Sequence, residues 1–203
     1  KHFILTADID LDPNLPGGRA FDTAVIAPGT VRGVGRFEGT PFSGVFDGNG
    51  HRILHLKVIG ESYLGLFGEV VSEAMISNLG LKAVDVNGTG DYVGGLVGSS
   101  GDWDNEGGIV ANCYSAGMVR GCDNVGGLVG RNCGSINMSY STASVCGEDC
   151  VGGLVGYNRY ADVTHCYSVG LVCSSTELIG GLVGCRGHDE VTDSFWDVET
   201  SGQ

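Results

Sequence analysis

Short runs of apolar residues alternate with small polar residues along most of this chain. The phrase Val-Gly-Gly-Leu-Val-Gly begins at Val93, Val125 and Val151, returns with isoleucine first at Ile179, and is preceded by a shortened form over residues 64–68. Its leucines lie at positions 66, 96, 128, 154 and 182, which gives steps of 30, 32, 26 and 28 residues. A near-constant step of this length is the sequence signature of a solenoid.

A second phrase accompanies the first in each repeat. It is a short apolar segment that in three of its copies closes on Tyr-Ser, and it occupies residues 76–81, 110–115, 136–141, 163–168 and 191–196. Both phrases are rich in Val, Ile and Tyr, with Gly, Asn, Asp and Ser between them. This composition indicates strands and turns.

The glycines favour one kind of solenoid. Three of the six positions in Val-Gly-Gly-Leu-Val-Gly are glycine, and in a helix interior each would cost about 0.5–1 kcal/mol relative to alanine. A coil of parallel strands tolerates them, and stacks like residues about 4.8 Å apart. We therefore predict an all-β, parallel β-helix without helices, as one domain over residues 1–203, with an irregular leading coil at 1–52 and repeats at 53–203. Which face of the strand Val125–Gly130 points inward stays open.

These phrases resemble the GLUG motif, a short repeat of bacterial secreted and surface proteins. The resemblance covers roughly residues 53–203, with four full copies, and the closing residues 194–203 are similar to the ending of such arrays. It implies a right-handed β-helical array. It implies no enzymatic activity, because family members with known enzymatic roles carry their catalytic residues outside the repeats.

Composition and charge exclude several classes of protein. The chain has 37 glycines in 203 residues, far above the usual ~7%, yet 42% of its residues are apolar and can build a core. Its formal charge is −13, so we expect no binding to nucleic acid or to anionic lipid. No apolar run approaches the ~20 residues of a membrane span, so no membrane insertion is expected.

Eight cysteines, an even number, suit an oxidising compartment and predict an extracellular or cell-surface location. Alignment of the repeats on their aromatic position puts Cys146 and Cys173 at the same point of adjacent coils, within disulfide range. The same alignment leaves Cys122 and Cys150 two positions apart on neighbouring coils. We predict the first pair, with the second as a weaker candidate.

The pairing of the other four cysteines stays open. Cys113 and Cys166 share a column, but Ser139 lies between them, which places them about 9.6 Å apart and beyond bonding reach. Cys133 and Cys185 each follow a Gly-Leu-Val-Gly, and either pair back to Cys113 and Cys166 respectively or remain free. The other interpretation is that some cysteines are buried thiols in the coil interior.

Three carboxylates near the N-terminus raise the question of calcium. Asp8, Asp10 and Asp12 alternate with Ile9 and Leu11 in an expected strand. The EF-hand pattern fails because the sixth position is not glycine and the twelfth is not glutamate. The two interpretations are a calcium site and an acidic face that protects an edge strand. We expect no other cofactor; His51 and His55 flank an expected strand without a third metal ligand nearby.

Two sequons and one tryptophan are candidate contact points with glycans. Asn87, in an expected turn, begins one N-glycosylation sequon, and Asn137, within an expected strand, begins another. Trp103 lies among acidic residues in the largest insertion into the repeat, residues 99–108. It is either a platform for a sugar ring or a side chain folded back over the coil.

Candidate catalytic groups are sparse. Asp123 aligns with Asp149 one coil away, near Glu148, but stacked turn aspartates are common in solenoids and no basic residue accompanies them. Residues 189–193 hold a second acidic group. Tyr114, Tyr140, Tyr167 and Phe195 align in one column and predict an aromatic ladder that stabilises the register of the coils.

The most consistent interpretation is a non-enzymatic, structural or adhesive rod, part of a surface protein or of an extracellular fibre. Because no capping helix or loop is expected at either end, we expect self-association end to end, or flanking domains of a longer chain that cover the ends. The alternative is a carbohydrate-binding or carbohydrate-cleaving β-helix that uses Trp103 and the Asp123–Asp149 pair, with glycans as partners.

Overall fold

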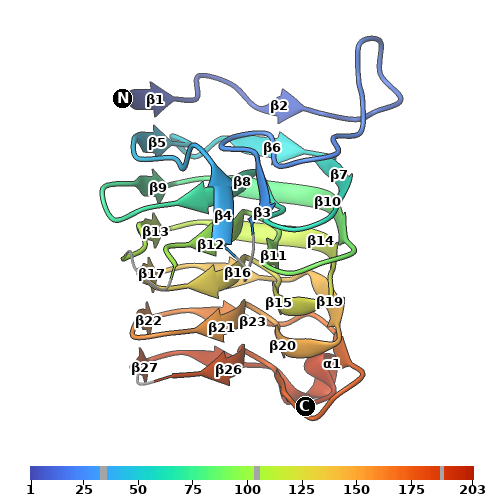
Figure 1. The fold of residues 1–203 in the computed structure, drawn as a ribbon, viewed down its shortest axis with the longest axis vertical. Coiled ribbons are helices and arrows are strands. Elements are labelled where there is room, and N and C mark those ends of the chain that lie inside the picture. The colour runs from blue at the N-terminus through green and yellow to red at the C-terminus, as the bar shows by residue number, and fades with distance from the viewer. Residues whose placement is uncertain (33–35, 103–105, 188–189) are drawn as a thin grey trace.

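The computed structural model describes residues 1–32, 36–102, 106–187 and 190–203. Its strands stack as successive coils of a parallel β-solenoid, with the N-terminus at one end of the stack and the C-terminus at the other (Figure 1). Trp103, His188 and Asp189 lie outside the described residues. The predicted all-β, parallel β-helical fold is confirmed.

Two sheets run along one half of the coil. The first has seven parallel strands, in the order β1 (His2–Ile4), β5 (Val45–Asp47), β9 (Met75–Ser77), β13 (Ile109–Ala111), β17 (Ser135–Asn137), β22 (Asp162–Thr164) and β27 (Val191–Thr192). The second follows the path β2 (Ile9–Asp10), β6 (Arg52–Leu54), β10 (Gly80–Gly88), β14 (Tyr114–Arg120), β18 (Tyr140–Ser141), β23 (Tyr167–Ser168) and β28 (Phe195–Trp196), with β7 (Lys57–Gly60), β19 (Ser144–Gly147) and β24 (Val172–Ser174) paired beside it.

Two further sheets complete the coil. One has the order β11 (Val93–Gly94), β15 (Asp123–Gly126), β20 (Asp149–Gly152) and β25 (Ile179–Gly180). The other has the order β8 (Phe67–Val70), β12 (Val97–Ser100), β16 (Val129–Asn132), β21 (Val155–Asn158) and β26 (Val183–Arg186). The repeated phrase therefore does not form one strand: it supplies the end of one strand and the start of the next.

The Gly-Gly pair makes this bend. A Cβ atom on Gly126 would collide with the Val129 carbonyl oxygen, and one on Gly127 would collide with the Ser141 hydroxyl of the next coil. Because the chain turns here, Val125, Leu128 and Val129 are all inside and fully buried. The question of which strand face points inward had no single answer, since the expected strand is bent.

The leucines of the repeat form a single file through the core. The Leu96 N–H donates to the Leu128 carbonyl at 2.9 Å, Leu128 to Leu154 at 2.9 Å and Leu154 to Leu182 at 2.9 Å. These leucines and the valines beside them belong to one continuous hydrophobic core. The burial of apolar surface in this core is the main stabilising term of the fold.

The leading coil departs from the repeat. Phe21 pairs with Val58, Ile26 with Phe67 and Phe42 with Val70, so this coil keeps the register of the stack. Between Ile26 and Phe42 the chain leaves the coil as an antiparallel hairpin, β3 (Gly29–Arg32) and β4 (Arg36–Gly39). Figure 1 shows the hairpin crossing the coils in front of the sheet that contains β8 and β12.

One expectation about the C-terminus is wrong. A one-turn helix, α1 (Val198–Ser201), follows β28, where no helix was expected. Asp197 caps its first turn by accepting a hydrogen bond from the Glu199 N–H, and Gly202 ends it in the left-handed conformation. Ser201 is fully buried, and the Gln203 side chain donates to the Val172 carbonyl. The helix covers part of the last coil.

Candidate functional site

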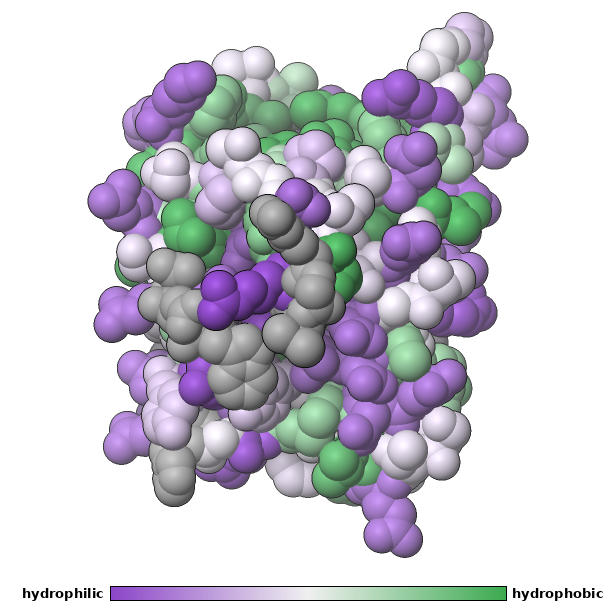
Figure 2. All heavy atoms as spheres, in the orientation of Figure 1, coloured by the Kyte–Doolittle hydropathy of each residue, from purple (hydrophilic) through white to green (hydrophobic). Residues whose placement is uncertain are grey.

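The two ends of the stack expose strand edges and apolar side chains. At the N-terminal end, β1 and β2 are the edge strands of their sheets, and Phe3, Ile4 and Ile9 are exposed. Figure 2 shows apolar side chains gathered at this end of the molecule. Such an edge offers unpaired backbone groups and an apolar surface to a neighbouring coil.

An apolar pocket opens at the same end. Its volume is about 430 Å³, and its lining includes Phe3, Ile26, Phe42 and Phe46. The Phe42 ring lies 6.1 Å from Phe3 and 5.1 Å from Phe67, measured between centroids. The pocket is thus an extension of the coil interior toward solvent.

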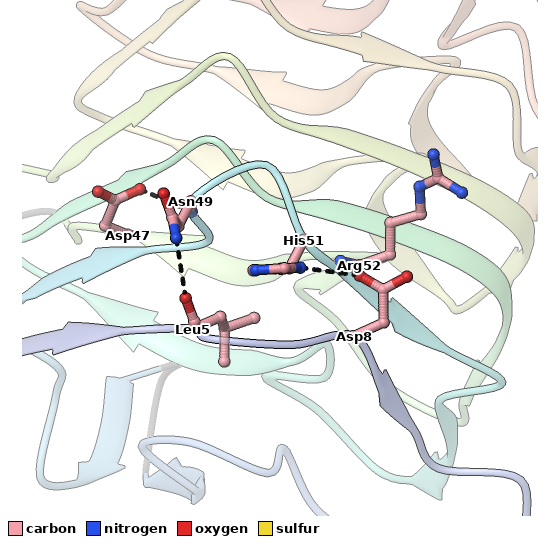
Figure 3. Close-up of polar contacts among 6 residues, drawn as sticks. All are labelled: Leu5, Asp8, Asp47, Asn49, His51 and Arg52. Atoms are coloured by element: carbon pink, nitrogen blue, oxygen red, sulfur yellow. Dashed lines mark hydrogen bonds and ion pairs between the residues drawn. The ribbon is translucent and has the colours of Figure 1, made fainter.

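Hydrogen bonds between aspartate and histidine side chains join the segment around β2 to the next coil. Asp8 accepts a hydrogen bond from the Arg52 N–H at 2.9 Å and lies 3.2 Å from Nδ1 of His51, as Figure 3 shows. Asp10 lies 2.8 Å from Nδ1 of His55. The hydrogen bond to Asp10 raises the pKa of His55, and that to His55 lowers the pKa of Asp10.

The three acidic residues near the N-terminus do not share one continuous strand. β2 contains two residues only, and Asp12 lies beyond it, where it accepts hydrogen bonds from the backbone and side chain of Asn14. Asp10 in turn accepts from the Asp12 N–H. The carboxylates of Asp8, Asp10 and Asp12 therefore bind local donors, and the calcium hypothesis stays a prediction.

The C-terminal end is also partly apolar. Phe195 is 60% exposed, Trp196 45% and Val198 59%, and β27, β28, β25 and β26 are the edge strands there. Trp196 lies over Gly181, whose missing side chain leaves room for the indole ring. Helix α1 covers only part of this end, so among the described residues the terminal strands at both ends of the stack have a strand partner on one side only.

A column of carboxylates lies at one turn of successive coils. Asp123 pairs in register with Asp149, as the alignment predicted, and the ligand atoms of Asp91, Cys122 and Asp123 lie within 4.8 Å of one another. Burial raises the pKa of Asp123, and Asp91 and Asp149 raise it further by repulsion. Burial likewise raises the pKa of the Cys122 thiol to about 12. Burial also raises the pKa of Asp91, so Asp91 and Asp123 hold their protons more tightly than a free aspartic acid does.

Two disulfides join adjacent coils on the outside. Cys146 is bonded to Cys173, with Cα atoms 4.6 Å apart, which confirms the first predicted pair. Cys150 is bonded to Cys185, with Cα atoms 4.9 Å apart. The weaker candidate, Cys122 with Cys150, is therefore wrong: the Cys122 thiol donates to Glu148 instead.

The geometry of the bend explains this second pair. Cys150 precedes one copy of the repeated phrase and has a left-handed backbone, φ 49°. The bend places Cys150 next to Gly184, the last residue of the next copy. The two backbones are so close that a Cβ on Gly184 would collide with the backbone of Cys150 and Val151. Cys185 follows Gly184 directly, so the two thiols face each other.

The remaining thiols are free. Cys113 and Cys166 are buried in the interior with Ser139 between them, because the Cys113 N–H donates to Ser139 Oγ at 3.1 Å. Cys122 and Cys133 are partly buried and free. The pairings of Cys133 with Cys113 and of Cys185 with Cys166 are wrong, and the interpretation of some cysteines as buried thiols is confirmed.

The two sequons differ in accessibility. Asn87 lies in strand β10, not in the expected turn, but it is exposed, and so is Thr89. Asn137 ends strand β17, and the hydroxyl of its sequon residue Ser139 is buried and donates to the Asn137 carbonyl. Only the first sequon presents both of its functional side chains to solvent.

A covered polar cluster was missed in the sequence. The Arg131 guanidinium lies 4.3 Å from the Tyr92 ring centroid and donates to Ser99 Oγ and to the Gly101 carbonyl, both at 3.0 Å. The Tyr92 and Tyr63 ring centroids are 4.7 Å apart. Glu69 is only 4% exposed, and burial raises its pKa to about 7.

The signal for this cluster was present in the repeat. Tyr63 and Tyr92 precede the repeated phrase, and Glu69 and Arg131 follow it, at the same two positions that Cys150 and Cys185 occupy later in the chain. Large or charged side chains at both positions indicate contact across the bend. The hairpin, whose Phe37 ring lies 5.0 Å from the Tyr63 ring, has no counterpart in the repeat.

The profile of the GLUG motif matches residues 147–174. The chain carries a GLUG motif. The matched segment is one complete turn of the solenoid, because its first residue, Gly147, pairs in register with its last, Ser174. The GLUG motif is therefore a structural unit here: it includes the bend at the paired glycines and one rung of each sheet.

Two comparisons extend beyond the GLUG motif. Over 100 residues the chain is 40% identical to a protein named Halomucin from Haloquadratum walsbyi (strain DSM 16790 / HBSQ001), a match that spans 47% of this chain and 1% of that relative. A crystal structure from Bacteroides ovatus, described as a "putative immunoglobulin A1 protease", superimposes with a TM-score of 0.73 at 23% identity, over 96% of this chain and 60% of the other. The second likeness concerns the fold alone.

No helix among the described residues has the length and apolarity needed to cross a lipid bilayer.

Proposed function

We propose that this chain is a non-catalytic, rod-like structural or adhesive module of an extracellular or cell-surface protein, joined end to end with further coils of the same kind. The observation that carries the proposal is the open edge at both ends of a rigid parallel stack. The GLUG motif and the two disulfides support an extracellular location.

The register of the stack supports stacking of a second copy. In the seven-stranded sheet the inward column starts at Phe3 and ends at Val191, and in the ten-stranded sheet it starts at Ile9 and ends at Trp196. Apolar side chains at both ends of both columns would meet if one copy continued the coil of another. This head-to-tail contact does not close, so it generates filaments.

Sedimentation and electron microscopy test the proposal. The purified chain should associate as its concentration rises and form filaments one solenoid wide. Trp196→Asp at one end and Phe3→Asp at the other should each reduce association, since each places a charge at the end of an inward column. Met138→Asp is the matched control, because Met138 is exposed on the side of the stack. A monomer at every concentration, without filaments, would contradict end-to-end assembly.

A second candidate function is carbohydrate cleavage or binding at the acidic turn. It is favoured by the stacked pair Asp123–Asp149 and by the raised pKa of Asp123, which suits a general acid. The test is a glycan array together with a reducing-sugar assay. Turnover that is lost in Asp149→Asn and kept in the exposed Glu73→Gln would favour an enzyme over the structural module.

A further inference from the structure

Three tyrosines stack on the outside of the ten-stranded sheet. Tyr114, Tyr140 and Tyr167 occupy one register position of strands β14, β18 and β23. Their ring centroids are separated by 4.9 and 4.7 Å, and neighbouring ring planes differ by 9° and 3°. Phe195 continues the stack at 5.5 Å and ends it.

We propose that this tyrosine ladder is a site of oxidative cross-linking, at which neighbouring phenols are joined by a carbon–carbon bond. The co-reactants are a peroxidase-type enzyme and hydrogen peroxide. Each of two neighbouring phenols loses one electron and one proton, and the two phenoxyl radicals couple at their ortho carbons. Each ortho hydrogen then moves to its ring oxygen, which restores both aromatic rings. The two electrons and two protons reduce one hydrogen peroxide to two waters.

The stack favours coupling within one molecule. Parallel strands hold each ring beside the next one, so a radical on Tyr140 has a partner on either side. The three rings are partly exposed, which admits a small oxidant to them. Phe195 has no phenol, so it cannot extend the cross-linked series beyond Tyr167.

A second tyrosine pair provides an internal comparison. Tyr63 and Tyr92 have the same separation as Tyr140 and Tyr167, 4.7 Å, but they are only 0% and 8% exposed. The Tyr63 ring also contacts Phe37 of the hairpin, with centroids 5.0 Å apart. In addition, the positive charge of the Arg131 guanidinium over the Tyr92 ring disfavours the loss of an electron from that ring. This pair should not react.

The consequence is a further covalent link between coils within the ten-stranded sheet. In that sheet Cys146–Cys173 already joins β19 to β24, and Cys150–Cys185 joins coils outside it. A bond between Tyr114 and Tyr140, or between Tyr140 and Tyr167, would tie neighbouring turns of the ladder and resist separation of the coils under load.

The experiment treats the whole purified chain with peroxidase and hydrogen peroxide. After reduction of the disulfides, trypsin cleaves after Lys82, Arg120, Arg131 and Arg159, among other sites, which puts the three ladder tyrosines in three different peptides. We expect dityrosine fluorescence from monomeric protein, and joined peptides lighter than their sum by two hydrogen atoms. Fragment spectra should place the bond at Tyr114–Tyr140 or Tyr140–Tyr167.

Phenylalanine variants keep the stacked rings and remove single phenols. Tyr140→Phe should abolish the intramolecular product, because the two phenols that remain in the ladder, those of Tyr114 and Tyr167, lie two coils apart. Tyr114→Phe should retain the Tyr140–Tyr167 product. The matched control is Tyr160→Phe, since Tyr160 is 65% exposed and outside the ladder, and it should leave the product unchanged. The proposal is overturned if Tyr140→Phe gives the same intramolecular yield, if coupling joins only different molecules, or if Tyr63–Tyr92 is the pair that reacts.

Discussion

Cys150 is bonded to Cys185, and two coils earlier the same two positions of the repeat hold Tyr92 and Arg131, whose guanidinium lies over the Tyr92 ring. In both cases the residue before one Val-Gly-Gly-Leu-Val-Gly phrase, or its isoleucine form, contacts the residue after the next one. The bend at the paired glycines therefore creates a contact between neighbouring coils that is filled with different chemistry at different levels. At one level the contact is a cation over an aromatic ring, and at another it is covalent.

Loss of this disulfide should destabilise the chain. The bond joins residues 35 positions apart, for which loop-closure entropy predicts about 3–4 kcal/mol. Cys185→Ser should lower the free energy of unfolding by about that amount, measured by chemical denaturation. Cys122→Ser, which removes a free thiol, is the control and should have a much smaller effect. Equal losses in the two variants would show that the bond does not constrain the unfolded chain.

The paired glycines should be intolerant of a single methyl group. A Cβ at Gly127 would collide with the Ser141 hydroxyl and with the Gly153 carbonyl oxygen. We expect Gly127→Ala to destabilise the protein by about 1–3 kcal/mol, the usual range for overpacking. Gly187→Ala is the matched control, since the nearest atom to its Cβ would be 3.6 Å away. Thermal unfolding that is unchanged in both variants would contradict the steric argument for the bend.

Glu69 should make stability fall as the pH rises. Burial raises its pKa from 4.5 to about 7, so the folded state holds a proton that the unfolded state releases between these values. The free energy of unfolding should therefore decrease across that window, by up to about 3 kcal/mol, and level off above pH 7. Glu69→Gln should remove most of this decrease, and the exposed Glu73→Gln should not. Unfolding curves at pH 5 and at pH 8 decide between the outcomes.

The contact between His55 and Asp10 should stabilise the fold only between two pH limits, one set by each partner. The pKa of His55 is raised, so its contribution is complete below pH 6.5 and is lost as the pH rises through its folded pKa. The pKa of Asp10 is lowered from 3.8, so its contribution is lost only as the pH falls below that value. NMR titration should show the His55 midpoint returning toward 6.5 in Asp10→Asn. An unchanged midpoint would show that Asp10 does not hold the proton on His55.

The two disulfides illustrate how far sequence reasoning reaches. Cys146 and Cys173 share one column, so alignment of the repeats was enough to pair them. Cys150 and Cys185 belong to different columns on different strands, and they meet only because the chain bends between β20 and β21, and again between β25 and β26. An alignment of the repeats shows which residues share a column, but not which columns the bend brings into contact. The alignment therefore paired Cys150 with the wrong residue.

The sequence by itself determined the coil, its register and its aromatic ladder, because a parallel stack places like residues above one another and a repeat of constant step makes that order readable. Only the tertiary structure decided the direction of the valines around the paired glycines, the hairpin that contacts Tyr63 through Phe37, and the one-turn helix at the C-terminal end. Each of these depends on where the chain leaves the repeat or turns within it. Such turns are set by collisions between atoms of different coils, which no single repeat contains.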